Sequence, residues 1–261
     1  MQQFPACKTA PFRAPAITFF FHEERTGGGD GGMVQIIGHR GARALEPENT
    51  LRAVARGLEC AGWVEVDVRL SREGVPVVIH DATLDRTTDG KGPVRETLLA
   101  DMRRLDAGKG ERIPLLQEVL DRVGHRGGLV VEAKEEAVPA ICSLLGSYGL
   151  EEVMLVSFHA GALPAARSLL PGLATGLIVS RPEGDPVEMA CRAGAGTVLP
   201  RQDLLSEGLV RDARGKGIRV IPWTLNTREE VLRAVVRGAE GFATDDPCAA
   251  REWVGSRRPR D

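Results

Sequence analysis

Carboxylate side chains interrupt two of the apolar runs that the sequence predicts as buried strands. Glu65 and Asp67 stand two residues apart in the run 64–68, and Glu132 and Lys134 repeat this spacing farther along the chain. Residues two apart on a strand point to the same side, so Glu65 and Asp67 share a face. Converging carboxylates are costly in a buried place unless a cation compensates them, and Mg²⁺ and Ca²⁺ prefer oxygen ligands. We therefore predict that Glu65, Asp67 and Glu132 hold Mg²⁺ or Ca²⁺.

A structural ion-pair network is the alternative explanation for these carboxylates. In that case Arg40, Arg69 and Lys134 would neutralise the negative charges. The spacing favours the metal site and leaves the network open.

Two of the five histidines stand at predicted strand ends beside a charged residue. His39 precedes Arg40, and His80 precedes Asp81. An imidazole titrates near neutral pH and therefore suits acid–base work. Cations that stabilise a phosphoryl transition state, together with imidazoles that move protons, indicate cleavage of a phosphodiester. The chain has no GxSxG and no P-loop motif, which argues against a serine hydrolase and a nucleotide kinase.

The elements that must position these residues alternate between β-branched runs and amphipathic stretches from residue 34 onward. Apolar residues recur at helical spacing in 51–58 and 115–123, and Thr227-x-x-Glu230 is a capping box. Such alternation predicts parallel strands joined by helices, and the chain length fits a barrel of about 250 residues. We predict a (βα)₈ TIM barrel, with a doubly wound open sheet as the alternative. The predicted strands are 34–37, 64–70, 75–80, 129–131, 153–156, 175–179, 197–199, 218–221 and 241–244.

The second and third of these runs are too close in sequence for a parallel connection, which needs a dozen or more residues. We predict a hairpin with a tight turn at Glu73-Gly74, whose register would place His80 opposite Asp67. Eight strands then remain for the barrel. The long polar stretch 81–110 after the hairpin arm is predicted to form a small insertion over the barrel mouth.

Residues 1–33 differ from the remainder of the chain. They contain three prolines, a short apolar run at 17–21 and a glycine-rich stretch at 27–32. We expect a flexible extension, with Met33 as a candidate native start, followed by a barrel domain over 34–261. The apolar run is too short for a membrane span or a signal-peptide core, so we expect no stable membrane anchor.

The composition is typical of a globular protein, with 43% hydrophobic and 27% charged residues. The 34 basic and 36 acidic residues give a net charge of −2, so the basic footprint of a nucleic-acid-binding protein is missing. The five cysteines have neither CxxC nor zinc-site spacing. We interpret Cys60, Cys142 and Cys191 as small buried hydrophobes, which fits a reducing compartment, and we expect a cytoplasmic location.

Short polar motifs follow one another in a characteristic order between about residues 34 and 247. They are Ile37-Gly38-His39-Arg40-Gly41, Pro47-Glu48-Asn49-Thr50, Glu65-Val66-Asp67-Val68, Val77-Val78-Ile79-His80-Asp81, Ile113-Pro114, Glu132-Ala133-Lys134, Trp223-Thr224-Leu225-Asn226 and Thr244-Asp245-Asp246-Pro247. In this order they resemble the glycerophosphodiester phosphodiesterase family. A single motif of this kind would be weak evidence, whereas the ordered set is specific.

The resemblance implies a (βα)₈ barrel that hydrolyses glycerophosphodiesters to glycerol 3-phosphate and an alcohol, in lipid and glycerol metabolism. It also implies that a glycerol hydroxyl attacks phosphorus first and that water then opens the cyclic phosphate. The family's roles fall by position on the residues of this chain. Glu65, Asp67 and Glu132 match the metal ligands, His39 and His80 match the acid–base pair, Arg40 and Lys134 match the phosphate-contacting cations, and Trp223 matches a residue at the substrate mouth.

Two alternatives stay open for the function. A lysophospholipase-D-type phosphodiesterase would need an apolar channel or a membrane-facing patch, and Phe19–Phe21 are the candidates for it. A non-catalytic barrel could bind phosphodiesters or metal, although such a relative would usually lose one of the predicted catalytic or metal-binding residues. The sequence indicates neither the oligomeric state nor the alcohol.

Overall fold

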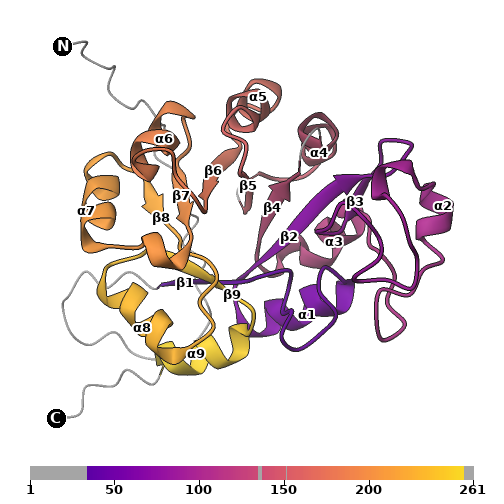
Figure 1. Cartoon of the computed structure of the whole chain (residues 1–261), viewed down its shortest axis with the longest axis horizontal. Coiled ribbons are helices and arrows are strands. Elements are labelled where there is room, and N and C mark those ends of the chain that lie inside the picture. The colour runs from indigo at the N-terminus through magenta and orange to yellow at the C-terminus, as the bar shows by residue number, and fades with distance from the viewer. Residues whose placement is uncertain (1–33, 135–136, 151, 256–261) are drawn as a thin grey trace.

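The computed structural model describes residues 34–134, 137–150 and 152–255, and in these ranges the chain forms a parallel barrel surrounded by helices (Figure 1). The strands are β1 (Gln35–Gly38), β2 (Trp63–Leu70), β3 (Pro76–Val78), β4 (Gly128–Ala133), β5 (Val153–Ser157), β6 (Ala174–Val179), β7 (Thr197–Pro200), β8 (Arg219–Val220) and β9 (Gly241–Thr244). The helices are α1 (Leu51–Cys60), α2 (Leu99–Met102), α3 (Leu116–Val123), α4 (Val138–Leu145), α5 (Ala162–Leu169), α6 (Pro186–Arg192), α7 (Glu207–Gly215), α8 (Arg228–Val236) and α9 (Pro247–Gly255).

Eight of these strands make the barrel, in the order β8-β7-β6-β5-β4-β2-β1-β9. The remaining seam between β8 and β9 is bridged by backbone hydrogen bonds from Glu240 N to Val220 O (3.2 Å) and from Ala243 N to Pro222 O (3.0 Å). The first strand, β1, pairs with the last strand, β9, from Gln35 opposite Gly241 to Gly38 opposite Thr244. The predicted (βα)₈ barrel is therefore confirmed, and the open-sheet alternative is wrong.

The hairpin of β2 and β3 is antiparallel, as the short connection predicts, but its register differs from the prediction by one residue. Val68 faces Val78, and Ile79 N donates to Asp67 O (3.0 Å), so Ile79 rather than His80 lies opposite Asp67. The reason is the turn. Ser71 N donates to Val75 O, so three residues rather than two form the loop, and Gly74 takes the left-handed conformation with φ of 79°.

The barrel interior is an apolar floor beneath the polar mouth. Side chains from every barrel strand or the residue beside it contribute to it, namely Ile37, Trp63, Val130, Met154, Val156, Ile178, Leu199, Ile221 and Ala243. Trp63 precedes Glu65 and Asp67 by two and four residues on β2, so the apolar floor and the two carboxylates share the inward face. A larger apolar cluster lies between the strands and the outer helices. The predicted capping box opens α8, where Thr227 Oγ1 accepts from Glu230 N.

The segment 81–110 contains little regular structure beyond a short 3₁₀ turn at Val94–Glu96 and α2, which lies at the outer edge of the β2–β3 side in Figure 1. Its apolar side chains pack against the hairpin arm and Ile113 in a small apolar cluster of the insertion, made of Val77, Ile79, Leu84, Val94, Met102, Ala107 and Ile113. Lys109 Nζ also donates to Leu45 O (3.2 Å) in the loop after β1. The insertion therefore borders the mouth and is held there by packing as well as by polar contacts.

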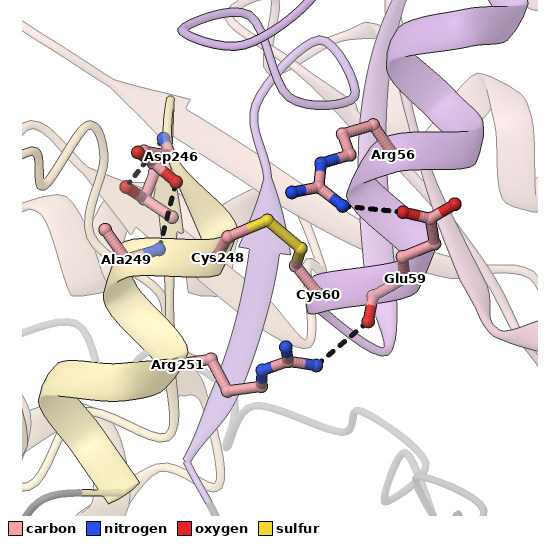
Figure 2. The surroundings of a disulfide bond; sticks show 8 residues. Arg56, Glu59, Cys60, Asp246, Cys248, Ala249 and Arg251 are labelled. Atoms are coloured by element: carbon pink, nitrogen blue, oxygen red, sulfur yellow. Dashed lines mark hydrogen bonds and ion pairs between the residues drawn. A yellow bond between two sulfur atoms is a disulfide. The ribbon is translucent and has the colours of Figure 1, made fainter.

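A disulfide bond joins Cys60, at the end of α1, to Cys248, in the first turn of α9 (Figure 2). The two cysteines are 188 residues apart in sequence, and Arg251 Nη1 donates to Glu59 O (2.9 Å) beside them. The interpretation of Cys60 as a lone buried hydrophobe is therefore wrong. Cysteine spacing could not reveal this pair, because only the closing of the barrel brings α9 against α1. Cys142 is buried and lies outside any disulfide bond, as predicted, whereas Cys191 is half-buried rather than buried.

The expected extension 1–33 lies outside the described residues. Within the described ranges, every helix is too short or too polar to cross a lipid bilayer.

Candidate active site

Three carboxylates meet at the carboxyl ends of two neighbouring strands, where active sites of this barrel type lie. Glu65 and Asp67 come from β2, and Glu132 comes from β4, where it stands directly opposite Asp67 in the parallel ladder. One ligand atom from each residue lies within 4.8 Å of the other two. Their side chains are buried, with residue exposures of 7%, 1% and 8% for Glu65, Asp67 and Glu132. The structure thus brings together the residues that the sequence predicts as a metal site.

Burial and mutual repulsion disfavour the ionised forms of two of these carboxyl groups. Burial raises the pKa of Glu65 well above its usual value, and the neighbouring Asp67 and Glu132 raise it further. Burial and Asp67 together raise the pKa of Glu132 to about 7, although Lys134 opposes them. Glu65 Oε1 is buried with no hydrogen-bond partner among the described residues. An orphaned, buried carboxylate oxygen facing two further carboxylates is the donor set that a hard divalent cation completes.

Arg40 and Lys134 supply the positive charge that is present. Arg40 Nε lies 3.2 Å from Asp67 Oδ2, and Lys134 Nζ lies 2.9 Å from Asp67 Oδ1 and also contacts Glu132. Burial acts to raise the pKa of Asp67, but these two cations outweigh it and hold that pKa far below its usual range. The ion-pair alternative is therefore partly realised. Among the described residues, neither of these two cations forms an ion pair with the Glu65 carboxyl group, so the network does not account for the whole cluster.

The loop after β1 is shaped to face these carboxylates. Arg40 and Asn49 both adopt left-handed conformations, with φ of 51° and 59°, which are uncommon and strained for residues other than glycine. The Arg40 backbone N–H donates to Glu65 Oε2 (2.8 Å). Asn49 Nδ2 donates to Asp67 Oδ2 (2.9 Å), and its Oδ1 accepts from Asp67 N (3.2 Å). A Cβ on Gly41 would lie 2.4 Å from the Ala53 backbone, so only glycine lets this loop pack on α1.

His39 is oriented from the far end of the chain. Its Nδ1 lies 2.7 Å from Asp245 Oδ1, and its Nε2 lies 4.0 Å from Glu65 Oε2. Burial acts to raise the pKa of Asp245, but the hydrogen bond with His39 and the nearby charges outweigh it, so the carboxylate stays ionised. Asn226 Nδ2 donates to Asp245 Oδ2 (2.9 Å) and fixes the carboxylate. His39 therefore directs Nε2 toward the carboxylate cluster.

His80 also has an aspartate partner. Its Nδ1 lies 2.6 Å from Asp81 Oδ1, so Nε2 takes no part in this hydrogen bond. Burial lowers the pKa of His80 below its ordinary value, although Asp67 and the hydrogen bond with Asp81 act in the other direction. The neutral imidazole is thus favoured at neutral pH. The electrostatic influence of Asp67, Lys134 and Arg40 on His80 shows that it borders the cluster despite the shifted hairpin register.

Trp223 lies beyond the cluster, half-buried, with its indole N–H donating to Leu199 O (2.9 Å). The ring of Phe158, which is 42% exposed, stands edge-to-face with it at a centroid distance of 5.7 Å. Phe158 also lies 5.9 Å from Lys134 Nζ. The mouth therefore has an aromatic wall formed by residues that follow β5 and β8, and an ionic wall on the side of β1 to β4.

Sequence reasoning assigned no role to Asn49, Asp81, Asp245 or Phe158. The first three stand inside the motifs quoted above, and their polar side chains beside a histidine or a carboxylate were the available signal. Phe158 follows a predicted strand directly, and exposure of a large aromatic residue cannot be read from that position alone.

The chain matches the model of the glycerophosphoryl diester phosphodiesterase family over residues 39–249. The chain belongs to this family. A glycerophosphodiester phosphodiesterase of Caldanaerobacter subterraneus is 36% identical over 228 residues, which cover 81% of this chain and 94% of that relative. A glycerophosphodiester phosphodiesterase of Bacillus subtilis is 30% identical over 249 residues, with 82% and 84% covered.

Solved structures of glycerophosphodiester phosphodiesterases share the barrel. A phosphodiesterase of Oleispira antarctica, solved in complex with the product sn-glycerol-3-phosphate, superposes with a TM-score of 0.80 and 30% identity, covering 85% of this chain and 97% of that one. A glycerophosphodiester phosphodiesterase of Thermotoga maritima gives a TM-score of 0.73 and 28% identity, with 83% and 96% covered. This chain therefore spans nearly the whole length of both relatives.

Proposed function

We propose that this chain hydrolyses glycerophosphodiesters to glycerol 3-phosphate and an alcohol, with a divalent cation and two histidines. The observation that carries the proposal is the meeting of Glu65, Asp67 and Glu132 beside two imidazoles that each contact an aspartate. Family membership supplies the substrate class, and the related Oleispira antarctica enzyme binds sn-glycerol-3-phosphate as its product.

The three carboxylates would hold the cation, and Mg²⁺ and Ca²⁺ both fit oxygen donors of this kind. When bound, the cation supplies positive charge for the phosphoryl oxygens of the transition state. The buried, orphaned Glu65 Oε1 supports this assignment, and so do burial and the neighbouring carboxylates, which raise the pKa values of Glu65 and Glu132. We assign phosphate contacts to Arg40 and Lys134, because both cations border the cluster, and a substrate contact to Trp223, because its ring lines the mouth.

His39 and His80 are proposed to move the protons. One Nε2 takes the proton from the glycerol hydroxyl that attacks phosphorus, and the other Nε2 gives a proton to the departing alcohol oxygen. Asp245 and Asp81 hold the Nδ1 atoms, so each ring keeps Nε2 available. When water opens the resulting cyclic phosphate, the two imidazoles exchange roles, as microscopic reversibility requires.

Release of glycerol 3-phosphate from glycerophosphocholine tests the proposal. Glycerophosphoethanolamine and lysophosphatidylcholine serve as parallel substrates. We expect turnover of both water-soluble diesters and slow or no turnover of the lysophospholipid. Preference for lysophosphatidylcholine would favour the lysophospholipase-D alternative, whose predicted apolar residues Phe19–Phe21 lie outside the described residues. Binding of diesters without turnover would favour the non-catalytic barrel.

We keep the cytoplasmic location and the role in lipid and glycerol metabolism as predictions. The Cys60–Cys248 disulfide weighs against the location, because such bonds are rare in a reducing cytosol.

A further inference from the structure

Arg86 lies in the insertion and has no role assigned so far. Its guanidinium forms hydrogen bonds with two carboxylates at the same time. Nε and Nη2 donate to Asp81 Oδ2 (2.6 Å) and Oδ1 (3.0 Å). Nη1 and Nη2 donate to Glu48 Oε2 (2.9 Å) and Oε1 (2.8 Å). Two paired forks on one arginine are a far more specific arrangement than a single exposed ion pair.

Each of the two carboxylates also contacts a residue of the candidate active site. Asp81 Oδ1 lies 2.6 Å from His80 Nδ1, and Glu48 Oε1 accepts from Arg40 Nη1 (2.6 Å). Arg40 in turn pairs with Asp67. One cation outside the site therefore connects the proposed acid–base residue His80 and the proposed phosphate contact Arg40 through one intermediate side chain each.

The insertion presents Arg86 from a fixed turn. Leu84, two residues earlier, is 1% exposed and packs in the apolar cluster of the insertion. Thr88 closes the turn, since its N–H (3.1 Å) and its hydroxyl (2.7 Å) both donate to Leu84 O. Leu84 N donates to Gly92 O (2.9 Å), which ties the turn to the following strand-like segment. The position of Arg86 thus depends on the fold of the insertion.

The electrostatics indicate that both carboxylates bound by Arg86 are ionised. The hydrogen bonds from Arg86 are the largest influence on Asp81 and hold its pKa well below the usual range. Burial acts to raise the pKa of Glu48, but Arg86 and Arg40 outweigh it and lower that pKa to about 2. Without Arg86, the Asp81 carboxylate would be free to turn toward water, and His80 would lose its fixed ring orientation.

We propose that Arg86 is a positioning residue of this enzyme, which couples the insertion to His80 through Asp81 and to Arg40 through Glu48. The inference rests on the proposed function of His80 and Arg40. It gives the apolar cluster of the insertion a role in the site. The cluster fixes the position of the Arg86 guanidinium, and the guanidinium fixes the orientation of His80 through Asp81 and of Arg40 through Glu48.

Steady-state kinetics of glycerol 3-phosphate release test the inference. We expect Arg86→Ala to lower kcat by about 10–100-fold, the range typical for partners of active-site ligands. Arg86→Lys should recover little, because an ammonium cannot grip two carboxylates as a planar fork does. Arg86→Ala should also raise KM, because Glu48 then holds Arg40 less firmly. Asp81→Asn should reproduce the kcat loss, and Glu48→Gln should reproduce the rise in KM. Arg56→Ala is the matched control, since Arg56 is equally exposed (45% against 46%) and pairs with Glu59 on α1.

A double-mutant cycle separates coupling from general destabilisation. In an Asp81→Asn/Glu48→Gln background, Arg86→Ala should change kcat/KM by less than about threefold, because its partners are already removed. An equal loss in both backgrounds, or an Arg86→Ala enzyme within twofold of the wild type, would overturn the inference. If Arg86→Ala does not fold, judged by its thermal transition, Arg86→Gln takes its place in the cycle.

The His80→Ala variant distinguishes the proposed acid–base role of His80 from the proposed positioning role of Arg86. If His80→Ala keeps full activity, the proposed acid–base role of His80 is wrong whatever Arg86 does. If His80→Ala is inactive while Arg86→Ala and Arg86→Gln are both unaffected, only the positioning inference is wrong.

Discussion

His39 and Asp245 are 206 residues apart in sequence, and their side chains meet at 2.7 Å between Nδ1 and Oδ1. The contact exists because β1 and β9 are neighbours, with Gly38 opposite Thr244, so each residue directly follows its strand at the same edge. Closing the barrel therefore also sets the orientation of His39.

Asp245→Asn is expected to lower kcat by about 10–100-fold, because an amide cannot stabilise the tautomer and the charge of His39 as a carboxylate does. The neighbouring Asp246 offers a matched control. Its Oδ1 accepts from Ala249 N (3.0 Å) at the start of α9, a contact that asparagine can keep. Asp246→Asn should stay within about twofold of the wild type in the glycerol 3-phosphate assay. Equal losses in the two variants would contradict the role of Asp245.

His39→Ala and His80→Ala should each lower kcat by about 10²–10⁴-fold, the usual contribution of a general acid or base. Both thermal transitions should stay close to that of the wild type, because neither side chain belongs to an apolar cluster. A nitrophenyl ester has a good leaving group and should rescue only the variant that lacks the general acid. Equal rescue of both variants would show that the two histidines do not divide the roles.

Much of this fold follows from alternation alone, since buried β-branched runs separated by amphipathic stretches allow few architectures. The carboxylate cluster was also predictable, because two carboxylates two residues apart in an apolar strand are costly to bury unless a cation compensates them. The hairpin register was missed because Gly74 permits a three-residue loop. The unbroken apolar run 77–79 has no alternation that would distinguish two registers one residue apart. Cys60–Cys248 and His39–Asp245 were missed because both depend on the first and last strands meeting.

Glu48 should make the folded state sensitive to acid. Its pKa is lowered from 4.5 to about 2 in the fold by Arg86 and Arg40, against the effect of burial. A depressed pKa stabilises the folded state above pH 4.5, and this contribution is lost as pH falls toward 2. We expect Glu48→Gln to lower the free energy of unfolding at pH 7 by about 1–3 kcal/mol, with the deficit shrinking below pH 4.5. Thermal unfolding from pH 7 to pH 3 measures this difference.

Glu59→Gln, at an exposed position on α1, is the control for that series. A deficit for Glu48→Gln that stays constant across the pH range would show that Glu48 stabilises the fold by something other than its charge.

The Cys60–Cys248 disulfide should stabilise the barrel, because it ties α1 to α9 across a long loop of the unfolded chain. Reduction, or the Cys60→Ser/Cys248→Ser double substitution, should lower the free energy of unfolding by about 2–5 kcal/mol. The variant should be insensitive to reductant, whereas the wild type should fall to the variant's transition temperature. Mass spectrometry of an unreduced digest should find the two cysteine peptides linked, and their separate elution would contradict the bond.

The dependence of turnover on a divalent cation tests the central claim most directly. The protein is stripped with EDTA and dialysed, and glycerol 3-phosphate release from glycerophosphocholine is measured before and after addition of Mg²⁺ or Ca²⁺. We predict that the stripped protein loses nearly all activity, that at least one of the two ions restores it, and that Glu65→Gln, Asp67→Asn and Glu132→Gln are not restored at the same ion concentration. Full turnover by the stripped protein in excess EDTA would contradict the account.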